Sequence, residues 1–269
     1  MNAILLLAVA LFAATEPTNA KEAAEKKAAA DKRLDEQYAT WVAKLPPEQQ
    51  AWERVLQQNL GGFYLPHHKR DKVAGRSNAW DFVVDDPKLP RVLLIGDSIS
   101  RGYTLNVRKA LAGKANVHRA PENCGPTANG LKKLDIWLGN GKWDLIHFNF
   151  GIHDRATTPS DYEQRLEQII ARLQKTGAKL MWANSTPLPP KSQYGSDAVM
   201  VERNAIATRV MKKHSIPIDD LHSHVQPRLA EFQNPGDCHF NGAGYEFLGK
   251  KVAGEILVAL GLNSATRLP

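Results

Sequence analysis

Ser98 follows a short run of apolar residues, 92–95, which Pro90 opens and Gly96 closes. Such a run predicts a parallel strand that is buried on both faces. A helix is expected to start near residues 100–103, and its unpaired N–H groups and positive dipole end would point back at the Ser98 hydroxyl. These surroundings suit a nucleophile, although an isolated Gly-Asp-Ser is more typical of a serine that only caps a helix.

Three further blocks of reactive or turn-forming residues follow Gly96-Asp97-Ser98. They are Asn123-Cys124-Gly125-Pro126-Thr127, Gly151-Ile152-His153-Asp154 and Gly236-Asp237-Cys238-His239-Phe240-Asn241. In order and spacing, residues 88–262 resemble the SGNH (GDSL-type) hydrolases, which carry G-D-S, a downstream glycine, G-x-N-D and D-x-x-H. The third and fourth blocks differ from the family in their letters. The resemblance implies an SGNH-type serine esterase that needs no cofactor.

The resemblance assigns Ser98 as the nucleophile and His239 as the base and then the acid. A serine hydroxyl reacts well only when an imidazole removes its proton and a carboxylate or carbonyl holds the other ring nitrogen. The family's acid position is occupied by Gly236, so Asp237 is expected to orient His239. The alternatives are a backbone carbonyl or one of two other acids, Asp219 and Asp220.

The resemblance also implies an oxyanion hole formed by the N–H groups of Ser98 and Gly125 and by the side chain of His153. His153 stands where the family has asparagine, and donation by an imidazole depends on its tautomer. Asn149 is a second candidate for the missing amide. The alternative for Asn149 is a hydrogen-bonded position in the buried strand.

Two acids and two cysteines stand inside these blocks. Asp97 and Asp154 are interpreted as supporting residues, and Asp154 as an acceptor that pins its loop. Cys124 and Cys238 lie in blocks that must meet, so we expect a disulfide between them, which an exported protein can keep. Two buried free thiols are the alternative. No metal site is expected, because the C-x-x-C and H-E-x-x-H spacings are missing from the sequence.

The elements that position these residues alternate as in a three-layer α/β/α, flavodoxin-like fold with about five parallel strands. Strands are expected at 92–95, 116–119, 145–150, 179–183 and near 216–218. Helices are expected at 103–112, 126–138, 161–176, 198–214 and 243–260. Ligands of such sheets bind beyond the carboxyl ends of the strands, so Ser98, Gly125 and His153 should converge there. The last helix would anchor the loop of His239.

The N-terminal third is expected to differ from this hydrolase domain, 88–269. Residues 1–20 have the apolar run and small polar end of a secretory signal, with a buried helix as the alternative. The run is too short to span a bilayer. We therefore expect a secreted or periplasmic protein that starts near Lys21. Residues 21–87 should form an extension with helices at 21–43 and 48–60 and loops over 63–89, and His67 and His68 are interpreted as solvated loop residues or residues at the site entrance.

The formal net charge of +7 favours acidic partners such as anionic glycans or membrane surfaces. No nucleic-acid partner is expected, because the basic residues are dispersed and carry no recognised motif. The resemblance, the export signal and the charge together favour a small O-acyl ester, above all an O-acetyl ester, on a polysaccharide. The alternatives are a lipid or thioester hydrolase and a non-catalytic glycan-binding protein.

Four residues are expected at the rim of the site as contacts for sugars or acids. They are Arg101, Arg155, Trp182 and Tyr194. For each of them the alternative is packing in the core or a place on the solvated surface.

Overall fold

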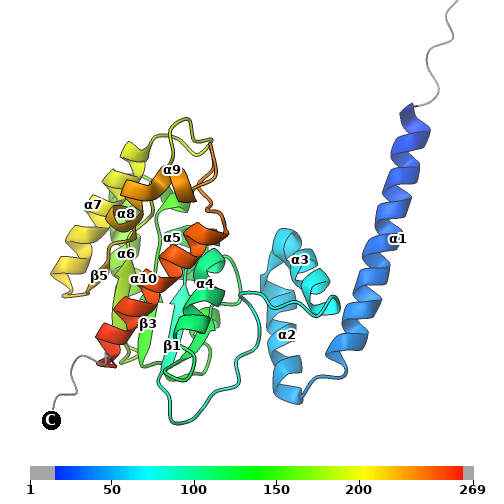
Figure 1. Cartoon of the computed structure of the whole chain (residues 1–269), viewed down its shortest axis with the longest axis horizontal. Coiled ribbons are helices and arrows are strands. Elements are labelled where there is room, and N and C mark those ends of the chain that lie inside the picture. The colour runs from blue at the N-terminus through cyan, green and yellow to red at the C-terminus, as the bar shows by residue number, and fades with distance from the viewer. Residues whose placement is uncertain (1–15, 263–269) are drawn as a thin grey trace, which may run out of the picture.

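A computed structural model of the chain describes residues 16–262, and it contains the expected parallel sheet with helices on both faces (Figure 1). The expected signal segment lies almost wholly outside the described residues. Five strands lie in the order β2-β1-β3-β4-β5, which is the flavodoxin-like order. Their bounds are β1 (Arg91–Ile95), β2 (Asn116–Arg119), β3 (Leu145–Phe148), β4 (Lys179–Ala183) and β5 (Ile218–Asp219).

Two groups of helices cover the two faces of the sheet. One face carries α4 (Ser98–Ala110), α8 (Leu221–Val225), α9 (Leu229–Phe232) and α10 (Gly242–Leu260). The other face carries α5 (Thr127–Leu138), α6 (Pro159–Gln174) and α7 (Asp197–Lys213). Short 3₁₀ helices η1 (Ile152–Asp154) and η2 (Gln226–Arg228) complete this part of the chain.

Strand β1 has the two-sided burial that its apolar run predicts. Val92 and Leu94 belong to the core beneath α4 and α10, whereas Leu93 and Ile95 belong to the core beneath α5, α6 and α7. Chain order reverses at β1, which lies between β2 and β3. The crevice beyond the carboxyl ends of β1 and β3 is therefore the expected place for a ligand.

The extension consists of α1 (Glu16–Val42), α2 (Pro47–Asn59) and α3 (Gly61–Val73), which stand beside the α/β domain (Figure 1). The expectation of loops over residues 63–89 is wrong for α3. Glycine and proline signals favoured a loop, but Pro66 is accommodated within the helix. A small core formed by Leu56, Leu60 and Trp80 holds this region together.

His68 is not a solvated loop residue. Its side chain is fully buried, and its Nε2 lies 2.8 Å from Glu53 Oε2, which also accepts a hydrogen bond from the Tyr38 hydroxyl. This buried cluster joins one residue from each of α1, α2 and α3. His67 is exposed beside Phe63, at 5.4 Å between ring centroids.

Two arginines of α4 contact the extension and the segment that follows it. Arg108 donates to the backbone carbonyls of Asn78 and Asp81, at 3.4 and 3.3 Å. Arg101 lies over the rings of Tyr64 and Trp80, with its Cζ 5.4 and 6.0 Å from the ring centroids. The helix that begins at the nucleophile therefore also contacts the extension.

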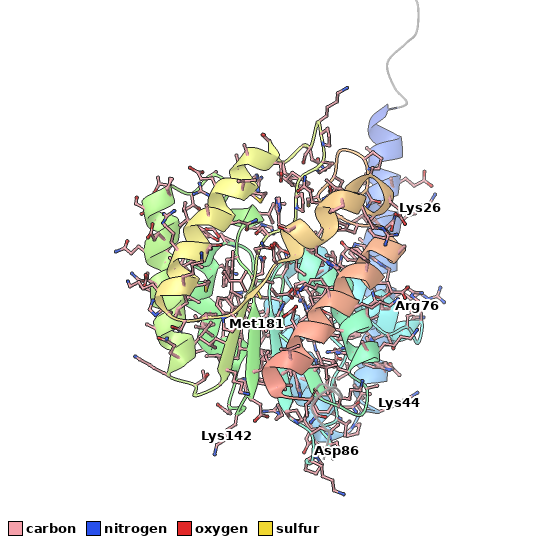
Figure 2. The ribbon with its side chains drawn as sticks, turned by 60° about the vertical axis from the view of Figure 1, so that its left-hand side comes forward. Lys26, Lys44, Arg76, Asp86, Lys142 and Met181 are labelled. Carbon is pink, nitrogen blue, oxygen red and sulfur yellow. The ribbon has the colours of Figure 1, made fainter. Side chains whose placement is uncertain are left out.

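Basic side chains project from widely separated points of the surface, as Lys26, Lys44, Arg76 and Lys142 show in Figure 2. Met181, by contrast, lies inside. None of the helices within residues 16–262 combines the length and the apolar character needed to cross a membrane.

Candidate active site

Ser98 lies at the carboxyl end of β1, where it is the first residue of α4. It does not cap the helix, because the cap is Asp97, whose side chain accepts a hydrogen bond of 2.9 Å from the Ile99 N–H. The helix thus begins a little earlier than expected. Ser98 therefore stands where helix N–H groups lack partners within the helix.

Arg119, at the end of β2, holds this turn from behind. Its Nη2 donates to the carbonyls of Gly96 and Asp97, at 3.0 and 2.8 Å, and its Nη1 donates to Ser100 Oγ. Burial lowers the pKa of Arg119 from its ordinary value. Three contacts from one rigid guanidinium fix the backbone that carries the nucleophile.

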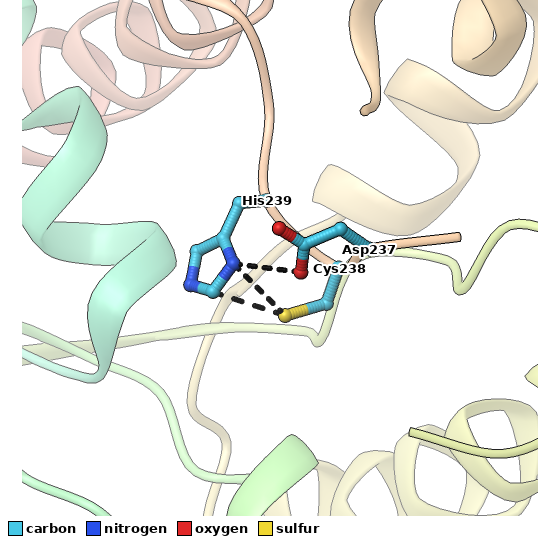
Figure 3. Close-up of side chains that lie close together, drawn as sticks. All are labelled: Asp237, Cys238 and His239. Carbon is cyan, nitrogen blue, oxygen red and sulfur yellow. Dashed lines mark hydrogen bonds and ion pairs between the residues drawn. The ribbon is translucent and has the colours of Figure 1, made fainter. Parts of the chain in front are cut away.

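His239 completes a chain of hydrogen bonds to the nucleophile. Its Nδ1 lies 2.8 Å from Asp237 Oδ1, a contact drawn in Figure 3, and its Nε2 lies 2.8 Å from Ser98 Oγ. A carboxylate at Nδ1 favours the tautomer with its proton there, which leaves Nε2 as the acceptor for the Ser98 hydroxyl. The expected residues Ser98, His239 and Asp237 are therefore brought together in the arrangement of a serine hydrolase.

The surroundings of Asp237 keep its carboxylate ionised, as the hydrogen bonds from Asp237 through His239 to Ser98 require. Partial burial acts to raise the pKa of Asp237, but the hydrogen bonds and charge of His239 outweigh it and lower the pKa. Asp237 is thus ionised at neutral pH and ready to stabilise an imidazolium. The other acids considered for this role are elsewhere, since Asp219 pairs with His147 at 3.0 Å and Asp220 caps α8.

Cys238 lies between the acid and the base, and its Sγ is 3.6 Å from His239 Nδ1 (Figure 3). Burial, followed by the charge of Asp237, raises the pKa of its thiol to about 12. The ligand atoms of Asp237, Cys238 and His239 lie within 4.8 Å of one another, so they form a set that could hold a metal ion. Such an ion would require the Cys238 thiolate, which burial disfavours, and would compete for the nitrogen that orients His239.

The loop that carries His239 is fixed by its neighbours. Asn241 caps α10, and its side chain accepts from the Gly244 N–H at 2.9 Å. The buried Gln233 donates from Nε2 to the Cys238 carbonyl at 3.2 Å. The anchoring expected of the last helix is thus present, with a second anchor in Gln233.

His153 lies in the loop after β3, and Gly125 lies in the loop after β2. His153 has an exposed side chain that lines the same cavity as Ser98. Gly125 has a φ of +66°, a conformation that favours glycine. Asp154 is fully buried and accepts from the backbone N–H and hydroxyl of Thr127, at 2.8 and 2.6 Å, so it pins one loop to the other as expected.

Asn149 does not line this cavity. Its Nδ2 donates to the Ala183 carbonyl at 2.8 Å, so it joins two strand ends. The structure thus supports the alternative interpretation of Asn149 as a residue hydrogen-bonded within the sheet. Gly151 lies so close to Ser185 that a Cβ there would be 1.8 Å from Ser185 Oγ, which explains the small residue in this block.

The expected disulfide between Cys124 and Cys238 is missing from the structure, and both thiols are free and buried. Cys124 packs in the core on the α5–α7 face of the sheet, whereas Cys238 packs in the core on the α10 face. Residues of both blocks, Asn123 of the first and Cys238 and His239 of the second, line the same cavity. Their cysteines point to opposite layers, which sequence order alone does not reveal.

The Ser98–His239 pair opens on a cavity of about 450 Å³. Three of the four expected rim residues, Arg101, Arg155 and Tyr194, line it. Trp182 does not, because it is fully buried in the core behind the sheet. The complete lining is Phe63, Tyr64, Ser98, Arg101, Asn123, Ile152, His153, Arg155, Tyr194, Cys238 and His239.

Sequence reasoning missed several contributors to this site. Phe63 and Tyr64 come from α3, a helix that was expected to be a loop, and no local pattern links them to Ser98. Asn123 stands two residues before Gly125, in a block already singled out, and this position could have identified it as a residue of the site. For Arg119 the sequence offered a weaker indication, a charged residue at the end of an expected strand.

Comparison with known proteins agrees with this geometry. The sequence pattern of the GDSL-like Lipase/Acylhydrolase family matches residues 94–247. A lipase/acylhydrolase from Enterococcus faecalis is similar in structure, with a TM-score of 0.56 and 24% identity over 62% of this chain and 95% of that chain. The acetylxylan esterase Axe2 from Geobacillus stearothermophilus is also similar, with a TM-score of 0.54 and 14% identity over 65% of this chain and 95% of that chain.

The acetyl xylan esterase AlAXEase is similar as well, with a TM-score of 0.55 and 15% identity over 62% of this chain and 99% of that chain. At these identities the likeness shows the fold. No curated protein matches the chain. The family pattern covers more than half of the 269 residues, including the nucleophile and the base. The chain therefore belongs to the GDSL-like lipase/acylhydrolase family and is an SGNH-type hydrolase.

Proposed function

We propose that the protein is a serine esterase that removes a small O-acyl group, above all O-acetyl, from a carbohydrate outside the cytoplasm. The observation that carries the proposal is the chain of 2.8 Å hydrogen bonds from Asp237 through His239 to Ser98, which opens on a cavity. Acetylxylan esterases among the structural neighbours support the choice of acyl group and substrate.

The first half-reaction forms an acyl-enzyme. Ser98 Oγ attacks the ester carbonyl carbon while His239 Nε2 takes the hydroxyl proton, and Asp237 stabilises the resulting imidazolium. The negative charge on the carbonyl oxygen needs donors. The N–H groups of Ser98 and Gly125 and the imidazole of His153 are proposed for this role. His239 then gives the hydroxyl proton to the departing alcohol oxygen, so the alcohol leaves and the acyl group stays on Ser98.

The second half-reaction returns the enzyme to its starting state. His239 removes a proton from water as the water oxygen attacks the acyl carbon, and it gives that proton to Ser98 Oγ as the bond from the acyl carbon to Oγ breaks and the carboxylic acid leaves. The same imidazole thus serves both halves from one position.

The lining of the cavity favours a polar acceptor over a long acyl chain. Among the described residues only one aliphatic side chain, Ile152, lines it, beside aromatic rings, imidazoles and guanidinium groups. Aromatic faces with a few directed polar groups are typical of sites that bind polar ligands such as sugars. This lining supports a carbohydrate ester over a lipid.

Hydrolysis of 4-nitrophenyl acetate and butyrate by the protein and its variants tests the esterase. We expect the wild type to hydrolyse the acetate ester faster than the butyrate ester. Ser98→Ala and His239→Ala should each lower kcat by about 10³-fold or more. His214→Ala is the matched control, because His214 pairs with Glu167 at the far end of α7. A fluorophosphonate should label the wild type and not Ser98→Ala.

Two results would count against this proposal. Preference for longer acyl chains would support the lipid or thioester alternative. A protein that neither hydrolyses these esters or acetylated xylan nor reacts with the fluorophosphonate would not be an esterase, and the glycan-binding alternative would replace it.

Export is the second part of the proposal, and it rests on the signal pattern of residues 1–20. The exported protein should begin near Lys21, which sequencing of its N-terminus would show. A chain found only inside the cell with its first residues intact would overturn this part and leave the esterase unaffected.

A further inference from the structure

The catalytic cavity has a positively charged lining without a matching acid. Arg101 and Arg155 line it, and no aspartate or glutamate does so among the described residues. Seven arginines within residues 16–262 form ion pairs with carboxylates, and neither of these two is among them. Both guanidinium groups thus stand beside the reactive serine with their charge unneutralised.

Aromatic rings hold the two guanidinium groups in place. Arg101 Cζ lies 5.4 Å from the Tyr64 ring centroid, and Arg155 Cζ lies 5.6 Å from that of Tyr194. Such stacking fixes the guanidinium plane and leaves its edge free for an acceptor. Arg155 uses one N–H on the Ile152 carbonyl at 3.2 Å, and the rest of its fork remains available.

Two residues of the cavity lining each have a buried polar atom with no hydrogen-bond partner within residues 16–262. These atoms are the Nε of Arg101, a donor, and the Oδ1 of Asn123, an acceptor. Unpaired polar atoms are costly, so the unpaired donor of Arg101 and the unpaired acceptor of Asn123 are compatible with a ligand that offers both an acceptor and a donor to these side chains. A sugar acid does so, with a carboxylate for the arginine and hydroxyl groups for the asparagine.

An exposed aromatic ring completes the cavity from the extension. Phe63 on α3 is 70% exposed, with its ring 4.8 Å from that of Tyr64. A large exposed aromatic side chain in a cavity wall is typical of a binding surface. Its flat face suits the apolar face of a pyranose.

We propose that the cavity binds an acyl acceptor that carries a carboxylate, with Arg101 and Arg155 on the carboxylate and Phe63 against the sugar ring. The proposal rests on the proposed esterase and names its substrate class, a carboxylated sugar. It also assigns a function to the extension, since Phe63 and Tyr64 of α3 form part of the acceptor site together with residues of the α/β domain.

A matched pair of substrates tests the proposal. One is an O-acetylated methyl glucuronoside, and the other is the same sugar with its carboxylate converted to a methyl ester, with acetate release as the readout for both. We expect the wild type to have a higher kcat/KM for the charged sugar. Arg101→Gln and Arg155→Gln should each lower the charged-to-neutral ratio, by about tenfold to a hundredfold for Arg101, because charge-assisted hydrogen bonds are strong.

Two further variants separate charge recognition from other effects. Arg165→Gln is the control, because Arg165 is on α6 and pairs with Asp161 at 3.9 Å, and its ratio should equal that of the wild type. Phe63→Ala should raise KM for both sugars by a similar factor and leave the ratio unchanged. If Arg101→Gln does not fold, Arg155→Gln and competitive inhibition of the wild type by free glucuronate, compared with glucose, give the same information.

Equal rates on the two sugars, or a ratio that neither arginine variant changes, would overturn the proposal while the esterase stands. The same holds for a wild type that cleaves 4-nitrophenyl acetate and neither sugar. A wild type that hydrolyses neither 4-nitrophenyl acetate nor either of the two sugars would instead show that the proposed function itself is wrong.

Discussion

Asp237 stands two residues before His239, whereas the family's acid stands three residues before its histidine, and it still reaches Nδ1 at 2.8 Å. The structure thus places Asp237 where the expected orienting acid would lie, although the letters of the block differ. The loop accommodates the shorter spacing because Gln233 and the cap of α10 fix it on both sides.

We expect Asp237→Asn to lower kcat on 4-nitrophenyl acetate by roughly 10²–10⁴-fold, because an amide cannot stabilise the imidazolium and permits the wrong tautomer. Steady-state rates would measure this. Asp161→Asn on α6 is the control, since Asp161 is not among the residues that line the cavity. A loss of less than threefold for Asp237→Asn would mean that a backbone carbonyl orients His239 instead.

The lowered pKa of Asp237 also makes a prediction about acid stability. A carboxyl whose pKa is lower in the folded protein than in the unfolded chain, where it is about 3.9, stabilises the fold above that value. This stabilisation is lost as the pH falls through the folded pKa. Asp237→Asn should therefore lose less stability between pH 5 and pH 2 than the wild type does, as judged from urea midpoints. If the urea midpoints of the wild type and Asp237→Asn fell in parallel with pH, the lowered pKa of Asp237 would be contradicted.

At the scale of elements, the close approach of α4 and α10 sets the distance between nucleophile and base. Gly102 on α4 faces Tyr245 on α10, and a Cβ at residue 102 would lie 2.0 Å from Tyr245 Cε1. Gly249 on α10 likewise faces Asn106 on α4, where an added Cβ would lie 2.5 Å from the Asn106 Cβ. The two helices thus pack through glycines on both sides.

Gly102→Ala should destabilise the protein by about 1–2 kcal/mol, because overpacking exceeds the gain in helix propensity. It should also lower kcat, since Tyr245 belongs to the first turn of the helix that anchors the His239 loop. Gly254→Ala is the control, because an added Cβ there would meet no atom of the described residues within 4 Å beyond its chain neighbours and the backbone of its own helix. Thermal unfolding and acetate-ester kinetics measure both effects, and equal stabilities for the two variants would contradict the packing argument.

The sequence predicts elements best where one physical signal acts alone. The four apolar residues of β1, 92–95, and the regular spacing of strands and helices identify the sheet, and the structure confirms it. Helix α3 was missed because Gly61, Gly62 and Pro66 disfavour a helix locally, whereas the buried contact of His68 with Glu53 stabilises one. The positions of Trp182 and of the two cysteines depend on which layer each side chain faces, and the sequence does not specify the layer.

At the scale of the whole molecule, a buried polar cluster joins the three helices of the extension beside a small apolar core. Glu53 accepts from Tyr38 and contacts His68, and all three side chains are buried. Glu53→Ala would leave two buried groups unpaired, which costs about 1–3 kcal/mol per group. We expect amide hydrogens of α1–α3 to exchange faster in this variant, with those of the sheet unchanged.

Glu48→Ala is the matched control, because Glu48 is exposed on the same helix. Since Phe63 and Tyr64 line the cavity, Glu53→Ala should also raise KM for sugar esters more than it raises KM for 4-nitrophenyl acetate. A uniform increase in exchange over the whole chain would show instead that the extension and the α/β domain unfold as one unit.

Ser98 and His239 are 141 residues apart in the chain. At about 5–20 residues per second, a ribosome needs roughly 7–28 s to synthesise that interval. During this time β1 already has its neighbours β2 and β3, which follow it closely in sequence, yet the serine has no base. Newly made chains and fragments truncated before α10 are therefore inert toward esters, and hydrolytic activity begins only when the last helix folds into place.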